Sequence, residues 1–225
     1  MHPLVTPGAG PIPGVPQHQP SNLFRFGEIT LYSTSQLVAG AIANTNNRLF
    51  TTPLGQTGQG WAAGMTVSET NLKEGGRIPS GQAYDVFGVA TQVMAMTAND
   101  GTMSPPFVQA AGAAGAVPDL QNIVNNGILV WDFTQTQVFI SPVMLAGAGG
   151  GVYGAIASTA AATPLGAMNN GNGGIWMYRK HPVALPGSST FAVEVAFGVH
   201  AAALGTAVAV RVVLLGYYKS VIEIG

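Results

Sequence analysis

Acidic side chains are the residues of this sequence whose types could support acid–base chemistry. Asp85, Asp132 and Glu194 each lie in a run that predicts a β-strand, so the fold could bring two of them together. Two carboxylates that flank a sugar are the usual requirement for glycoside hydrolysis. Asp132, within Val-Trp-Asp-Phe, is the best single candidate. An ion pair of this strand acid with Arg77 or Arg211 across an interface is the favoured interpretation.

Patterns typical of metal and nucleotide sites are weak. Histidine occurs at four scattered positions, His2, His18, His181 and His200. They form none of the spacings of a metal site, and His200 is expected to be a satisfied or interface residue. The stretch 149–154 matches GxGxxG, but no acid follows it at the distance that a dinucleotide fold needs. A flexible loop is the expectation there.

Serine and tryptophan complete the set of candidates. Ser141, Ser188 and Ser189 lack the context of a nucleophile elbow. The three tryptophans, Trp61, Trp131 and Trp176, could line a sugar-binding face, although tryptophans of a β-sandwich are more often core or interface anchors. The sequence therefore predicts no catalytic, cofactor-binding or metal-binding residues, and we expect that the protein is not an enzyme.

Strand patterns dominate the chain. Runs rich in β-branched and aromatic residues predict strands at 23–33, 48–52, 82–96, 128–140, 175–180, 191–200 and 207–218, with shorter ones at 61–68 and 221–224. Residues 128–140 would form two strands or one bent strand, and 207–218 is expected to pair with 191–200. One short helix is predicted at 118–127, ended by a glycine. Eight to ten strands with little helix predict an all-β sandwich, and an eight-stranded jelly roll fits best.

The predicted strand at 82–96 is apolar on both of its faces. Alternation places one set of side chains on one face, Tyr84, Val86, Ala90, Met94 and Met96. It places the other set, Asp85, Phe87, Val89, Thr91, Val93 and Ala95, on the opposite face. Such a strand is expected to be covered on both sides. We expect an opposing sheet on one side and another copy of the protein on the other.

The predicted domain organisation is simple. Residues 1–22 hold six prolines and no Asp, Glu, Lys or Arg, so an extended N-terminal arm is expected, with residues 23–225 as one jelly-roll domain. The arm either drapes over a neighbouring subunit or is a floppy terminus. Residues 99–117 and 146–174 are expected to be long Gly/Ala-rich loops.

Charge is unusually sparse. Only 17 of 225 side chains are Asp, Glu, Lys or Arg, 8% against about 25% in ordinary soluble domains. Such a surface tends to associate, so much of it is expected to be covered by neighbouring subunits. The net charge of −1 gives no electrostatic footprint for a nucleic acid. There is no cysteine, so a disulfide framework is excluded.

Three stretches give the sequence a family resemblance. They are Arg48–Gln56 leading into Glu69–Leu72 and Arg77–Val86, the glycine-rich Leu145–Gly151, and Leu185–Gly187 with Arg211–Gly216 as a closing strand pair. Together they span most of residues 45–218. In these stretches the sequence resembles the jelly-roll major capsid proteins of tailless icosahedral bacteriophages, of the vertical, single-roll type.

This resemblance implies a structural virion protein that self-assembles into an icosahedral shell. Its partners would be its own copies, as a trimeric, pentameric or hexameric capsomer, together with other capsid, vertex or minor proteins and an internal membrane. Its location would be the virion, assembled in the cytoplasm of the host cell. Direct nucleic-acid binding is not expected, because the arm is not basic. The alternative function is a carbohydrate-binding or receptor-binding β-sandwich module of a spike or lectin type.

Overall fold

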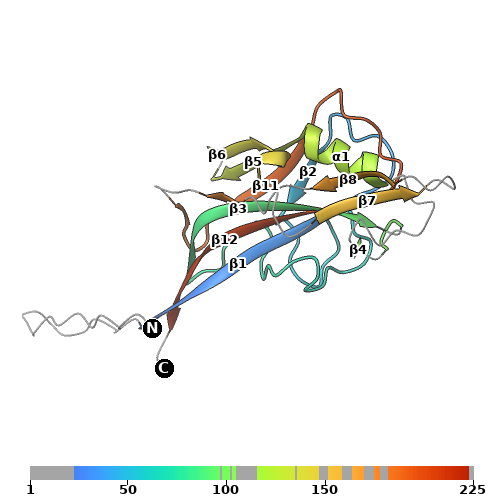
Figure 1. The fold of residues 1–225 in the computed structure, drawn as a ribbon. Coiled ribbons are helices and arrows are strands. Elements are labelled where there is room, and N and C mark those ends of the chain that lie inside the picture. Colours follow the sequence, from blue (N-terminus) through green and yellow to red (C-terminus); the bar gives the residue numbers. More distant parts are fainter. Residues whose placement is uncertain are drawn as a thin grey trace, which may run out of the picture.

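The longest strands of the chain form the largest sheet of the computed structural model (Figure 1). The structure describes residues 23–96, 98–101, 103–104, 116–134, 136–146, 152–158, 164–169, 175–177 and 182–222. In the large sheet the strands lie in the order β1 (Leu23–Leu37), β12 (Val208–Ile222), β3 (Gln82–Met96) and β10 (Val183–Leu185). Two short strands, β4 (Met103–Ser104) and β9 (Trp176–Met177), also pair with β3. All of these pairs are antiparallel.

The small sheet faces the large one. Its order is β2 (Asn46–Leu49), β11 (Phe191–Phe197), β5 (Gly127–Phe133) and β6 (Thr136–Pro142), and every pair is again antiparallel. Helix α1 (Ala116–Asn126) and the 3-10 helix η2 (Val143–Ala146) lie beside it, and β7 (Val152–Ser158) pairs with β8 (Pro164–Asn169) as a separate two-stranded sheet. Two antiparallel sheets around one core are consistent with the predicted all-β sandwich.

The core lies between the two sheets. Strand β11 supplies its odd-numbered side chains, which are large and apolar, while its even-numbered positions face outward. Trp131 of β5 is fully buried in the same layer, and even-numbered residues of β12 such as Val210 and Val212 meet it from the large sheet. Period-two alternation in both sheets therefore produces a single main hydrophobic cluster.

A β-bulge in β3 changes which of its residues face the core. The pairing with β12 shifts between Leu215 and Gly216, so that Leu215 lies opposite Gly88 but Gly216 lies opposite Val86. One extra residue on β3 reverses the alternation beyond this point. Val86 and Val89 both belong to the main core, whereas Met94 and Met96 belong to a second cluster on the outer face. The predicted division of this strand into two constant faces is therefore wrong.

A segment of the chain's own, residues 58–71, covers one end of that outer face. We name this segment the strap. Trp61 packs against the cluster of Met94 and Met96, and its Nε1 donates a hydrogen bond to the Thr34 carbonyl oxygen at 3.0 Å. Gln59 donates to the same oxygen at 2.9 Å. Part of the second cover of β3 is thus intramolecular, while cover by another copy stays a prediction for the rest of the sheet.

Most of the predicted elements are confirmed. Strand β3 has the predicted bounds, the helix is found at Ala116–Asn126, and residues 128–140 form two strands, β5 and β6. The predicted strands at 207–218 and 221–224 are one continuous strand, β12. The arm predicted at 1–22 lies outside the described residues, and the single domain at 23–225 stays a prediction.

Four predictions about local structure are wrong. Strand β12 pairs with β1 and β3 rather than with β11, because residues 198–207 carry the chain from one sheet to the other. The predicted pair of Leu185–Gly187 with Arg211–Gly216 is not formed, since β10, which ends at Leu185, and β12 flank β3 on opposite sides. Residues 61–68, predicted to be a strand, form no strand and lie within the strap. The predicted loop at 146–174 contains β7 and β8.

Candidate interaction surfaces

Two of the three candidate acids come together on the small sheet. Asp132 of β5 and Glu194 of β11 both point away from the core, and they are diagonal neighbours, because Asp132 lies opposite Ala192 and Glu194 opposite Val130. Asp85 lies on β3 in the large sheet. The fold therefore separates Asp85 from the other two candidates.

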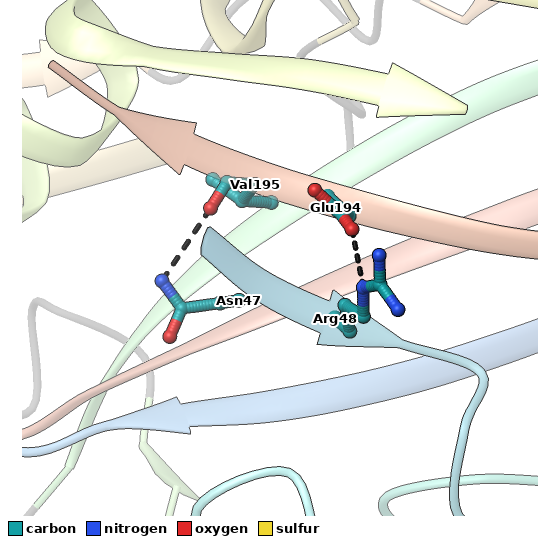
Figure 2. A network of polar contacts seen from close by, with 4 residues as sticks. All are labelled: Asn47, Arg48, Glu194 and Val195. Atoms are coloured by element: carbon teal, nitrogen blue, oxygen red, sulfur yellow. Dashed lines mark hydrogen bonds and ion pairs between the residues drawn. The ribbon is translucent and has the colours of Figure 1, made fainter. Parts of the chain in front are cut away.

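Glu194 is engaged by a neighbouring strand, as Figure 2 shows. Arg48 of β2 lies directly opposite Glu194, and its Nε forms an ion pair with the carboxylate Oε1. Glu194 is buried, whereas Arg48 is exposed. On the same strand Asn47 donates a hydrogen bond from Nδ2 to the Val195 carbonyl oxygen at 3.4 Å. These contacts fasten the edge strand β2 to β11, which is a structural role.

Asp132 lines a shallow polar depression next to this ion pair. Its other lining residues are Arg48, Thr134, Gln137, Thr190, Phe191 and Ala192, around about 500 Å³. Arg77, one predicted partner of Asp132, pairs instead with Glu74 at 3.6 Å. An ion pair between Asp132 and an arginine of another copy stays a prediction.

Arg211, the other predicted partner of Asp132, holds the strap against the large sheet. Its Nε donates to Thr34 Oγ1 at 3.0 Å, its Nη2 donates to the Ser68 carbonyl oxygen, and its guanidinium lies 5.6 Å from the centre of the Tyr32 ring. Burial lowers the pKa of Arg211, and the nearby Tyr32 and Glu69 act in the opposite direction. The guanidinium is therefore committed to contacts within its own chain.

The three tryptophans do not share a face. Trp131 is in the core, Trp61 belongs to the strap and packs against the outer face of β3, and Trp176 of β9 is 41% exposed. A sugar-binding face made of all three is therefore wrong, because the two-sheet fold points Trp131 inward.

The remaining candidates have local roles or lie outside the described residues. His200 is exposed in the turn after β11, whereas His2, His18 and His181 are among the residues that are not described. Ser189 donates to the Pro186 carbonyl oxygen at 2.5 Å, and buried Ser141 donates to the Pro142 carbonyl oxygen at 3.3 Å. Of the GxGxxG stretch, Val152–Gly154 belongs to strand β7, so the loop predicted there is wrong for these residues. Across the described ranges, no three His, Asp or Glu side chains are grouped as metal ligands.

Large apolar side chains are exposed in several places. On the large sheet and its edges they are Phe26, Ile29, Val67, Ile175, Trp176, Met177 and Tyr217. Around the small sheet and η2 they are Ile140, Met144 and Leu145. Phe26 is 69% and Tyr217 53% exposed, so the outer face of the large sheet presents aromatic surface to solvent.

The outer ends of β1 and β12 run past the small sheet (Figure 1). A groove lies along this part of the two strands. We name it the tyrosine groove, and its volume is about 450 Å³. It is lined by Phe26, Gly27, Glu28, Ile29, Leu31, Asn71, Leu72, Lys73, Arg77, Ile78, Pro79, Gln82, Tyr84 and Tyr218. Its centre is a row across three strands, because Gly27 lies opposite Tyr218 and Tyr218 opposite Tyr84.

Two tyrosine rings in contact with each other line the centre of this groove. The ring centres of Tyr84 and Tyr218 are 5.3 Å apart and the rings are tilted by 50°. Burial raises the pKa of Tyr84 to about 12, and the nearby Tyr218 contributes in the same direction. The Tyr84 phenol is therefore a neutral hydrogen-bond donor at ordinary pH.

Sequence reasoning missed the tyrosine groove, although a signal was present. Gly27 and Gly216 interrupt two runs that otherwise read as strands, and a glycine within a strand indicates a bulge or a close approach. A Cβ added at Gly27 would meet nothing within 4 Å, so this position opens the groove. The sequence pattern alone could not show that the small sheet ends before it reaches this part of β1 and β12.

Comparisons with known proteins give no relative. No protein-family model matches the chain, and neither the curated proteins nor the solved structures include a match. Within the part of the chain that is described, no helix has the length and apolar character needed to span a membrane.

Proposed function

We propose that the protein is the building block of a self-assembling shell, a structural virion protein with a jelly-roll fold. The observation that carries this proposal is the pairing of the eight main strands. The first strand of this set pairs with the last, β1 with β12, and the second with the seventh, β2 with β11. The third pairs with the sixth, β3 with β10, and the fourth with the fifth, β5 with β6.

This nested pairing is what results when one long antiparallel ribbon is wrapped around a barrel, which is the topology of a jelly roll. The wrapped ribbon splits into two four-stranded layers, in agreement with the order of both sheets. Jelly rolls occur in viral capsids, lectins and cupins. The fold alone therefore supports several functions, and the surface has to discriminate among them.

The surface favours association with other copies. The described residues expose large apolar side chains on the outer face of the large sheet and beside η2, and the whole chain has only 17 charged residues. A monomer with this surface would be poorly soluble, whereas contacts in a closed shell would bury it. The proposed partners are identical copies in a capsomer, together with minor virion proteins and a membrane inside the shell. The proposed location is the virion.

Particle size tests this proposal. Full-length protein is purified and examined by light scattering and negative-stain electron microscopy over a range of salt concentrations. Closed shells or regular arrays of capsomers are expected. A monodisperse monomer or small oligomer under all of these conditions would contradict the proposal.

A second candidate function, carbohydrate binding, has one observation in its favour. The Phe87 and Tyr217 rings are 5.1 Å apart, and Tyr217 lies in register between Glu28 and Asp85 on the neighbouring strands. An exposed aromatic ring can stack on a sugar, and the two carboxylates beside it can accept hydrogen bonds from the sugar hydroxyls. A glycan array probed with wild type and Tyr217→Ala tests it, and binding that is unchanged in the variant excludes this surface.

A further inference from the structure

We propose that the tyrosine groove is the docking site for the proline-rich segment, residues 7–20, of a second copy of the chain. The inference rests on the proposed self-association and names the two surfaces that would meet. The groove belongs to the described residues, and the segment lies before Leu23, where β1 begins.

The shape of the groove suits an extended chain. Gly27 lines the groove and has open space around the position that a Cβ would take, so no side chain fills the floor of β1 at this point. Ile29, 39% exposed, and the half-buried Tyr218 provide apolar walls on either side. Proline-rich segments bind such aromatic-lined grooves as polyproline II helices, which lose little conformational entropy on docking.

The hydrogen-bonding character of the groove also fits. Proline has no N–H group, so a proline-rich segment presents mainly carbonyl acceptors. Donor groups are contributed to the groove by Lys73, Arg77, Gln82 and the two tyrosines. Among the described residues, neither tyrosine hydroxyl has a hydrogen-bond partner. The segment carries no Asp, Glu, Lys or Arg, so its docking would bury no unpaired charge.

The spacing of the prolines supplies one apolar face. A polyproline II helix has three residues per turn, so positions that differ by multiples of three share a face. Pro7, Pro13 and Pro16 satisfy this rule. Val15 lies between the last two of them and would be near the groove when they dock.

The direction of β1 favours a second copy over the same chain. Leu23 lies opposite Ile222 at the far end of the β1–β12 pair, so the groove lies between this end and the body of the sandwich. A segment that docked on its own groove would have to reverse within residues 20–22. Pro16 and Pro20 restrict Val15 and Gln19 to extended conformations, so the residues before Pro20 could not easily share in such a reversal, and docking on a neighbouring copy is favoured.

Site-directed cross-linking tests the inference, and the chain is suited to it because it has no cysteine. Full-length Val15→Cys and Lys73→Cys proteins are mixed under assembly conditions and treated with a short bismaleimide. A covalent heterodimer that links residues 15 and 73 is expected, identified by mass spectrometry of the linked peptides. The control replaces Lys73→Cys with Gln137→Cys, an exposed position on the small sheet. An equal yield at Gln137 would overturn the inference.

A groove-filling variant makes the test specific. In the Gly27→Val background the added side chain projects into the groove, because a Cβ at this position meets nothing within 4 Å. We expect the 15–73 link to fall by about tenfold or more, which corresponds to roughly 1.4 kcal/mol of lost binding. Gly198→Val, a second glycine with open space around its Cβ, is the matched control and should leave the link unchanged. An unchanged link in Gly27→Val would overturn the inference.

Two further readouts separate the possible failures. A doubly substituted Val15→Cys, Lys73→Cys protein, diluted into excess wild type, gives an intrachain link if the segment docks on its own groove, and this result would overturn docking on a second copy. Light scattering of the same samples reports on the proposed function. If particles form without a 15–73 link, the docking inference is wrong but the shell proposal stands. If no particles form, the shell proposal is contradicted.

Discussion

At the scale of single residues, buried polar groups hold the loops of the sandwich in place. Asp119, in the first turn of α1, is 5% exposed and accepts hydrogen bonds from the backbone N–H groups of Gly205 and Thr206 at 3.0 and 2.8 Å. It also accepts one from the Thr206 hydroxyl at 2.8 Å. One carboxylate thus fixes the loop that leads into β12 and is stabilised by the helix N-terminus.

Removal of this carboxylate should be costly. Asp119→Ala leaves two backbone donors without their acceptor, and we expect the free energy of unfolding to fall by about 2–3 kcal/mol. Urea unfolding monitored by tryptophan fluorescence measures the change. Gln121→Ala, at an exposed position of the same helix, is the control and should stay within about 0.5 kcal/mol of wild type. Equal stability of the two variants would contradict this role of Asp119.

The raised pKa of Tyr84 predicts a pH dependence. Between the usual tyrosine pKa of 10.0 and the folded-state value of about 12, the unfolded chain releases this proton while the folded chain keeps it. The free energy of unfolding should therefore fall as pH rises through this interval, and the contribution should be complete below pH 10. Tyr84→Phe should show a smaller fall than wild type in denaturant unfolding between these pH values. Identical slopes would show that Tyr84 does not titrate as inferred.

At the scale of elements, we expect substitution of the two glycines of the β1–β12 pair, Gly27 and Gly216, to have different effects on stability. A Cβ at Gly216 would lie 2.8 Å from the Asp85 carbonyl oxygen and 3.2 Å from Val86 Cα, which are backbone atoms beside the bulge of β3. Gly216→Ala should cost about 2–3 kcal/mol because this backbone has to move. Gly27→Ala, with open space around the added methyl group, should change stability by less than about 0.5 kcal/mol. Thermal unfolding of the Gly216→Ala and Gly27→Ala proteins measures this difference in stability. Equal melting temperatures of the two variants would contradict the prediction.

The predictability of the elements follows their physical origin. Strand β3 and helix α1 were predictable, because local alternation and a terminating glycine mark them in the sequence. The bulge at Phe87 was not, because it arises from pairing with a strand about 130 residues away in the sequence. For the same reason the sequence could not assign β11 and β12 to different sheets. Local sequence specifies a strand, whereas its partner depends on the whole fold.

The surface features likewise fall into those that composition reveals and those that depend on the fold. Sparse charge is a property of composition and is visible in the sequence. The ion pair of Arg48 with Glu194 and the position of Asp132 beside it depend on strand register, which the sequence did not give. The tyrosine groove depends on where the small sheet ends, so Gly27 is the one lining residue that marked it in the sequence.

At the scale of the whole molecule, the few charges predict how assembly responds to solution conditions. Contacts dominated by apolar surface strengthen with sulfate and weaken on cooling, whereas contacts dominated by ion pairs weaken as salt screens them. We therefore expect the scattering intensity of the assembled protein to rise with ammonium sulfate and to fall between about 25 and 5 °C, where hydrophobic attraction weakens. Dissociation by sodium chloride alone would instead indicate ionic contacts between subunits.

The adjacent ends of β1 and β12 also have a mechanical consequence. Leu23 and Ile222 lie opposite each other in an antiparallel pair, so a force that pulls these two residues apart loads the hydrogen bonds of the pair in succession. Strands loaded in this way peel apart from one end, at lower force than strands that are sheared along their length. The sandwich should therefore be mechanically weakest at the β1–β12 tip, and peeling that starts there would first open the walls of the tyrosine groove.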